Sequence, residues 1–172
     1  PLTYEAEKLF GIDLNDDGVQ GRNVQPFDRE AFTNENNIST FAAVDSRTLL
    51  TDIQSGELLS ADPDNNSIQI LLTNKDGSSF KCYDHQTAID IEQTDDGTLK
   101  LLQYRAEYET TKRVRKLIDR RYQYVDELET VPASFFITSF DSSGVLIQET
   151  TQLNIADPLT YEAENLFGID LN

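Results

Sequence analysis

The chain has 172 residues, enough for one ordinary domain, and its 31 acidic and 14 basic side chains give a formal charge of −17. So acidic a surface repels phosphate backbones and anionic lipids, which argues against nucleic acid as a partner, and we expect no membrane insertion because no apolar run approaches a membrane-spanning length. The single cysteine, Cys82, leaves the compartment open.

Residues 1–21 are predicted to form a short junction helix that leads into an acidic loop. The loop from Asp13 to Val19 fits the pattern D-x-[DN]-x-[DN]-G, in which alternating oxygen ligands converge and a glycine allows a sharp turn. Asp13, Asn15 and Asp17 would supply side-chain oxygens and Val19 its carbonyl oxygen, a hard ligand set that suits Ca²⁺. The pattern therefore predicts a calcium site, with a turn that binds no ion as the alternative.

The predicted calcium loop departs from a complete EF-hand. Its twelfth position is Val24, where an EF-hand has a bidentate glutamate, and no amphipathic helix follows the loop. Another carboxylate would have to complete the ligand sphere. Glu7, Asp28 and Glu30 are the nearby candidates.

The chain between the two ends divides into a connector and a body. Residues 22–60 are rich in asparagine and other polar side chains, which predicts a polar connector of weak structure with a short helix near residues 29–33. Residues 61–156 predict a β-rich module body built of antiparallel hairpins, as a small β-sandwich or a curled sheet. The strands expected in it are residues 68–73, 79–83, 88–93, 98–108, 134–140 and 145–152.

The stretch from residue 111 to residue 128 fits both a helix and a strand, and a long β extension is slightly favoured. It holds six of the 14 basic residues. Because the rest of the chain is strongly acidic, contact with an acidic neighbouring module is favoured over nucleic acid, and a solvated basic face is an equal alternative. The residues assigned to an inter-module contact are Arg113, Arg115, Lys116, Arg120 and Arg121.

The end of the chain repeats its beginning. Residues 158–172 match residues 1–15 except for Asn165 in place of Lys8. A near-identity at an offset of 157 residues marks the edges of a repeating unit. We therefore expect a tandem array in which residues 158–172 start the next junction repeat, with an engineered duplication or a coincidental cut as the alternative.

The second copy carries the same helix and loop signals as the first. Asp157 is a suitable N-cap, Pro158 suits the first helical turn, and Gly168 suits the left-handed residue after a helix. Asp170 and Asn172 would be the first two ligands of the next calcium loop. Calcium would then lie at the joint between consecutive modules.

Residues 7–21, 91–97 and 136–144 carry three motifs that resemble, in order, those of the tryptophan-rich repeat domains of large cyanobacterial surface and secreted proteins. The motifs are E-x-x-F-x-x-D-L-N-G-D-G-x-I-G, the A-E-Q-T-x-x-G turn and the V-W-x-x-D-S-x-G hairpin. The chain has no tryptophan, so it resembles a divergent member. The resemblance implies a β-rich module, repeated in long extracellular chains, with a calcium loop and no catalytic activity.

Together these features predict a structural tandem-repeat module of a calcium-stabilised filament, sheath or surface layer outside the cell, whose partners are neighbouring copies of the module. The alternative is an adhesin or carbohydrate-binding module with glycans as partners. An enzyme is not expected, because the single histidine, His85, has no nucleophile arranged with it and no phosphate-binding loop or zinc spacing is present.

Overall fold

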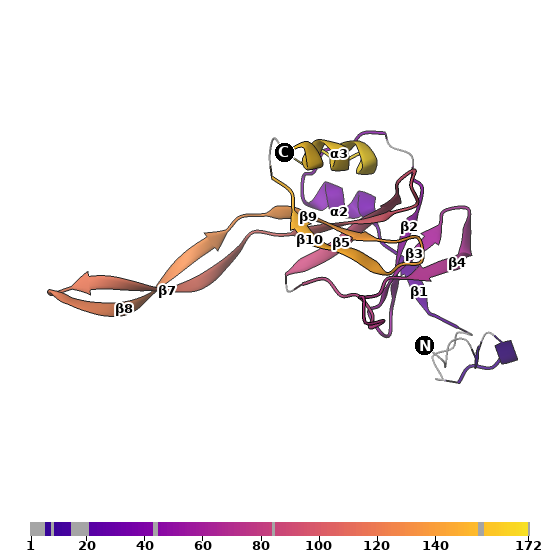
Figure 1. Ribbon diagram of the computed structural model, residues 1–172, viewed down its shortest axis with the longest axis horizontal. Coiled ribbons are helices and arrows are strands. Elements are labelled where there is room, and N and C mark those ends of the chain that lie inside the picture. The colour runs from indigo at the N-terminus through magenta and orange to yellow at the C-terminus, as the bar shows by residue number, and fades with distance from the viewer. Residues whose placement is uncertain are drawn as a thin grey trace.

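The computed structural model describes the chain except for residues 1–5, 8, 15–20, 43–44, 84, 155–156 and 172, and the side chains of residues 66 and 67. The described residues form mainly antiparallel β-sheet with two short helices (Figure 1), which confirms the expected mainly β class. The elements are β1 (Val24–Pro26), α2 (Arg29–Glu35), β2 (Thr48–Asp52), β3 (Leu58–Asp62), β4 (Asn65–Leu71), β5 (Gln86–Gln93), β6 (Leu99–Arg105), β7 (Tyr108–Ile118), β8 (Arg121–Val131), β9 (Ser134–Phe140), β10 (Leu146–Gln152) and α3 (Pro158–Phe167). Residues 6, 7, 9 and 10 are also helical.

Two four-stranded sheets make the body. The first has the strand order β1-β2-β3-β4 and the second the order β10-β9-β6-β5. Apolar side chains from both sheets share one buried cluster, which includes Leu49 and Leu58 from the first sheet and Ile91, Leu101 and Phe140 from the second. Burial of this cluster stabilises the packing of the two sheets against each other.

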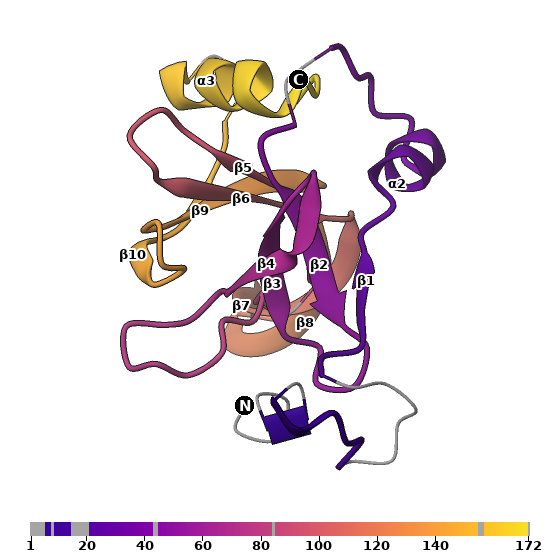
Figure 2. The same ribbon diagram turned by 90° about the vertical axis from the view of Figure 1, so that its right-hand side faces the viewer.

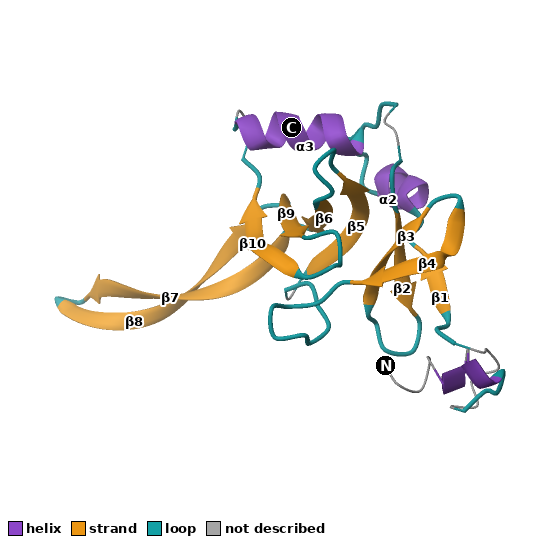
Figure 3. Cartoon of the chain, turned by 45° about the vertical axis from the view of Figure 1, so that its right-hand side comes forward, coloured by secondary structure: helices purple, strands orange, loops and turns teal. Residues whose placement is uncertain are grey.

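The second sheet is buried on its other face as well. Neighbouring residues of β6 point to opposite faces, so that Leu101 joins the cluster between the sheets while Leu102 packs with α3. Helix α3 lies over this outer face and buries Ala163 and Phe167 against it (Figure 3). The last helix of the chain is therefore part of the body's core.

The predicted ends of α3 are confirmed. The side chain of Asp157 caps the helix by accepting a hydrogen bond from the Leu159 amide at 3.0 Å, and Pro158 occupies the first turn. Gly168 ends the helix in the left-handed conformation, at φ 61°. At 10 and 7 residues, α3 and α2 are both too short to cross a bilayer, and the described residues hold no membrane-spanning helix.

Strands β7 and β8 form an arm that projects from the body (Figure 1). The arm follows the pairing of β6 with β9: Leu99 pairs with Phe140 at one end and Ile118 with Arg121 at the other. The register is the same on both sides of a break in pairing at residues 106–107 and 132–133. This confirms the favoured β extension over residues 111–128.

Two expectations about the body were wrong. Residues 22–60 do not form a weakly structured connector, because they supply α2 and the strands β1, β2 and most of β3, and the expected boundary at residue 60 falls inside β3. Residues 79–83 make only an isolated bridge, between Ser79 and Thr73, rather than a strand. The short helix expected near residues 29–33 is present as α2.

Candidate functional site

The two copies of the repeated segment have the same local backbone. Gly11 has φ 65° and Gly168 has φ 61°, both in the left-handed region that glycine adopts without steric cost. The Gly11 amide donates to the Glu7 carbonyl at 2.8 Å, and the Gly168 amide donates to the Glu164 carbonyl at 2.8 Å. The sequence of the segment therefore determines this helix ending in both places.

A glutamate in each copy holds the loop that follows the helix. The Glu7 carboxylate accepts from the Leu14 amide at 3.0 Å and from the Gly21 amide at 3.1 Å, while Glu164 accepts from the Leu171 amide at 3.1 Å. Glu7 is fully buried. The Glu7 carboxyl group therefore restrains the backbone at two positions, Leu14 inside the acidic loop and Gly21 just after it.

The proposed calcium ligands are only partly described. Asp13 is half-buried next to the Glu7 contact, and Asp170 is exposed, with its backbone amide donating to the Ser39 carbonyl at 2.8 Å. The remaining loop ligands lie outside the described residues; they are Asn15, Asp17, Val19 and Asn172. Within the described part of the chain, no group of three or more His, Cys, Asp or Glu side chains gathers as a metal site.

The other two carboxylates suggested for the calcium site lie on α2. Asp28 is its N-cap and accepts from the Ala31 amide at 2.9 Å, and Glu30 is exposed in its first turn. Figure 2 shows α2 at the opposite end of β1 from the described part of residues 6–14. Among the described residues, Asp28 and Glu30 therefore lie at the other end of β1 from Asp13.

The two copies differ sharply in environment. In the second copy Phe167 and Ile169 are completely buried and Leu171 is 8% exposed. The equivalent side chains of the first copy, Phe10, Ile12 and Leu14, are exposed by 53% to 67%. Leu9 is exposed by 77%, whereas its equivalent, Leu166, is partly buried. One segment thus completes the core at one end of the chain and presents the same apolar stripe to solvent at the other.

Backbone contacts also tie the second copy to the body. The Phe41 amide donates to the Gly168 carbonyl at 2.8 Å, and Thr40 forms an antiparallel bridge with Ile169. The Arg29 guanidinium donates to the Phe167 carbonyl. These contacts satisfy carbonyl groups at the end of the helix that would otherwise be unpaired.

The basic residues assigned to an inter-module contact all lie on the arm. The guanidinium of Arg113 lies 5.2 Å from the ring of Tyr124 and that of Arg115 lies 4.2 Å from the ring of Tyr122, while Lys116 pairs with Glu127. Arg120 and Arg121 lie at the tip. Four large apolar or aromatic side chains lie on the face of the arm that carries Arg113 and Arg115, and they are 62% to 75% exposed. They are Leu117, Tyr122, Tyr124 and Leu128.

Sequence reasoning missed a buried carboxyl pair on β5. The Asp90 carboxylate lies 2.6 Å from the Arg29 guanidinium, and the Glu92 carboxylate accepts from the amide and hydroxyl of Ser46. Burial raises the pKa of Asp90 to about 6 and that of Glu92 to about 7. In the sequence, Asp90 and Glu92 alternate with Ile89 and Ile91, which predicts a strand with one polar face. This alternation does not reveal that the fold buries both faces of the strand.

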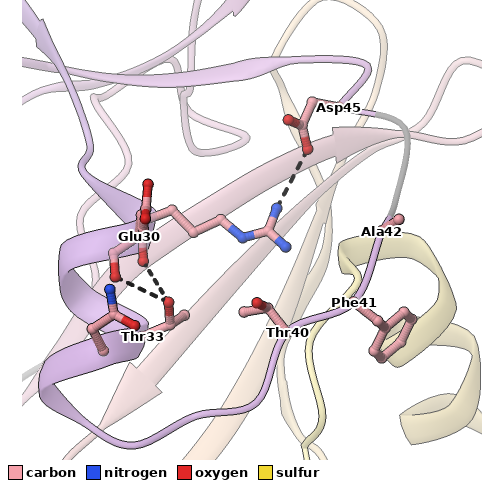
Figure 4. Close-up of a pocket in the computed structure, with 8 residues that line it drawn as sticks. Glu30, Thr33, Thr40, Phe41, Ala42 and Asp45 are labelled. Carbon is pink, nitrogen blue, oxygen red and sulfur yellow. Dashed lines mark hydrogen bonds and ion pairs between the residues drawn. The ribbon is translucent and has the colours of Figure 1, made fainter.

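An open hollow lies between α2 and residues 40–42 and 45, and Arg29, which contacts Asp90, lines it (Figure 4). Arg29 reaches across it toward Asp45, at 3.4 Å, and the Thr33 hydroxyl donates back to carbonyls of its own helix. The ion pair between Arg29 and Asp45 thus joins α2 to the other wall of the hollow.

Comparisons of the chain with protein-family models, curated proteins and solved structures found no match. The similarity of three motifs to tryptophan-rich repeats remains a prediction.

Proposed function

We propose that the chain is a structural module of an extracellular tandem-repeat filament, sheath or surface layer, and that the repeated segment is the joint between modules. The observation that carries this proposal is that one segment has two environments. Residues 158–171 complete a body, whereas in the first copy, which precedes β1 in the chain, the equivalent apolar side chains of Phe10, Ile12 and Leu14 are exposed. A segment that is the last element of one unit and the lead into the next belongs to a joint.

Calcium at the acidic loop is the second part of the proposal. Asp13, Asn15 and Asp17, with the carbonyl oxygen of Val19, have the hard oxygen chemistry that Ca²⁺ prefers, and Asp170 and Asn172 would begin the equivalent site. Glu7 supports this reading because it restrains the backbone at residues 14 and 21, inside the loop and just after it. Bound calcium would offset the repulsion among the loop carboxylates and stiffen the joint.

The arm gives the module a second surface for neighbouring copies. Its exposed apolar face and basic tip contrast with the acidic remainder of the chain. Charge complementarity between an arm and an acidic body would set the register of neighbours. Catalysis has no part in this proposal.

Titration calorimetry of the full chain with Ca²⁺ tests the proposal, because the chain includes one complete loop. We expect binding in the range of extracellular modules, with a dissociation constant of about 10⁻⁴ to 10⁻³ M, and its loss in the double variant Asp13→Ala/Asp17→Ala. The matched control is Asp62→Ala/Asp64→Ala, which removes two carboxylates from another acidic turn. No calcium binding, or equal loss in both variants, would refute the calcium site.

A further inference from the structure

We infer that residues 1–14 are a docking segment for the α3 groove of a second copy of this chain, an inference that rests on the proposed role of the repeated segment as a joint. The α3 groove is the outer face of the second sheet, where Ile89, Leu102 and Ile137 receive α3 and the residues after it, together with Leu153 just after β10. The proposed partner is a second copy of this chain, because its α3 groove binds the same sequence when α3 packs there.

The first copy retains every side chain that the second copy buries in the groove. The matching pairs are Thr3 and Thr160, Ala6 and Ala163, Phe10 and Phe167, Ile12 and Ile169, and Leu14 and Leu171. The single difference between the copies, Lys8 against Asn165, falls where Asn165 is exposed. The difference therefore leaves the buried interface unchanged.

The polar contacts of the groove would be reproduced too. Phe41 donates to the carbonyl of Gly168 and Ser39 accepts from the amide of Asp170, so these bonds use only backbone groups of the docked segment. Gly11 already has the left-handed conformation of Gly168. At Gly11 the first copy thus has the backbone conformation that the docked segment has at Gly168.

The first copy would dock on a second molecule, because α3 of the same chain already occupies the groove of its own body. Figures 1 and 2 place the described part of residues 6–14 at the far side of the body from α3. Docking of one chain's first copy on the next chain's groove is a head-to-tail contact between different surfaces, which generates open chains or rings. Exposed apolar side chains at Phe10 and its neighbours favour this contact whenever a groove is vacated.

Full-length variants test the inference by vacating the groove. The measurement is light scattering with size-exclusion chromatography in EDTA and about 1 M salt, which suppresses charge-driven contacts between copies. Phe167→Asp should detach α3 and yield oligomers that grow with protein concentration, because the first copy of another chain replaces it. The matched variant Phe10→Asp should stay monomeric like the wild type, and Phe10→Asp/Phe167→Asp should lose the oligomers. Equal size distributions for Phe167→Asp and the double variant would overturn the inference.

A second measurement applies if Phe167→Asp does not fold. A fluorescent peptide with the sequence of residues 1–15 is added to the folded wild-type chain at increasing urea, below the unfolding midpoint, where α3 opens transiently. We expect rising anisotropy for this peptide and none for its Phe10→Asp counterpart. Failure of the first peptide to bind at any urea concentration, or equal binding of both, would overturn the inference.

Omitting calcium separates this test from that of the proposed function. If the first copy binds the α3 groove in EDTA but the chain binds no calcium, only the metal site is refuted. If the chain binds calcium but the first copy does not bind the groove, the docking inference is refuted and a calcium-bound joint remains.

Discussion

The buried carboxyl groups of Asp90 and Glu92 make the stability of this acidic protein depend on pH. Burial raises both pKa values, to about 6 and about 7, although Arg29 partly offsets the effect at Asp90. The folded protein therefore holds protons that the unfolded chain releases at ordinary carboxyl pKa values. Stability must fall as pH rises from about 4.5 through about 7, because deprotonation then leaves charge in the interior.

Glu92 is the residue on which this prediction is tested. We expect Glu92→Gln to raise the urea midpoint at about pH 8 and to flatten its decline between about pH 5 and pH 8, because the amide stays neutral throughout. The control is Asp95→Asn, which removes one charge from an exposed turn and should leave the decline unchanged. Parallel midpoint curves for wild type and Glu92→Gln would contradict the prediction.

Single residues also show which features of the site follow from sequence. The N-cap Asp157 and the left-handed Gly11 and Gly168 were predictable because a cap or a glycine acts within a few residues. The different burial of Phe10 and Phe167 was not, because their local sequences are the same and the difference lies in what packs against them. The hydrogen bonds that Glu7 accepts from Leu14 and Gly21 join residues up to 14 positions apart, and the spacing of residues in the sequence does not reveal them.

Among the elements, the arm shows how pairing resolves an ambiguous pattern. The apolar residues over 111–128 fit a helix or a strand, so the stretch alone could not settle its structure. The structure of this stretch follows from its neighbours: β7 and β8 pair in the same register as β6 and β9, so the stretch forms strands. A two-stranded ribbon has marginal stability, and the stacking of Arg113 and Arg115 on tyrosine rings adds to it.

The turn at the tip of the arm contains two non-glycine residues in a left-handed conformation, which destabilises it. Asp119 and Arg120 connect the strands with φ angles of 51° and 62°, the two positive values that a two-residue type I′ turn requires and that Asn-Gly adopts most readily. Arg120→Gly should stabilise the tip by about 1 kcal/mol, because glycine removes the steric cost of the left-handed conformation.

Amide hydrogen exchange measures this effect locally. Arg120→Gly should slow exchange of the paired residues near Ile118 and Arg121 and leave the body unaffected. Arg120→Ala removes the same charge but keeps a side chain at positive φ, so it should give no such protection. Equal protection in both variants would attribute the effect to charge instead of backbone conformation.

For the molecule as a whole, the sequence predicted a repeating, mainly β chain but missed the extent of its body. The connector expected over residues 22–60 supplies most of the first sheet. Strands β2 and β3 have five residues each and mix leucine with polar residues, which leaves too short a pattern to identify a strand. Their burial comes from packing against the second sheet, which no local signal encodes.

The distribution of charge over the whole chain leads to a prediction about assembly. Residues 112–121 carry six basic side chains and one acidic, a net charge of +5, against −22 for the rest of the chain. Such an asymmetry favours contact between the arm of one copy and the acidic body of another, and salt weakens contacts of this kind by shortening the Debye length from about 30 Å at 0.01 M to about 3 Å at 1 M. We expect self-association at low ionic strength that disappears as salt is added.

Sedimentation velocity over a range of salt concentrations checks this expectation. Arg120→Glu/Arg121→Glu should abolish the low-salt association, because it reverses charge at the tip without touching the arginines that stack on Tyr122 and Tyr124. Lys75→Glu/Lys81→Glu makes the same change in net charge on the body and should preserve most of the association. If both variants lost it equally, general repulsion between acidic chains would explain the result, and the arm would have no specific part in assembly.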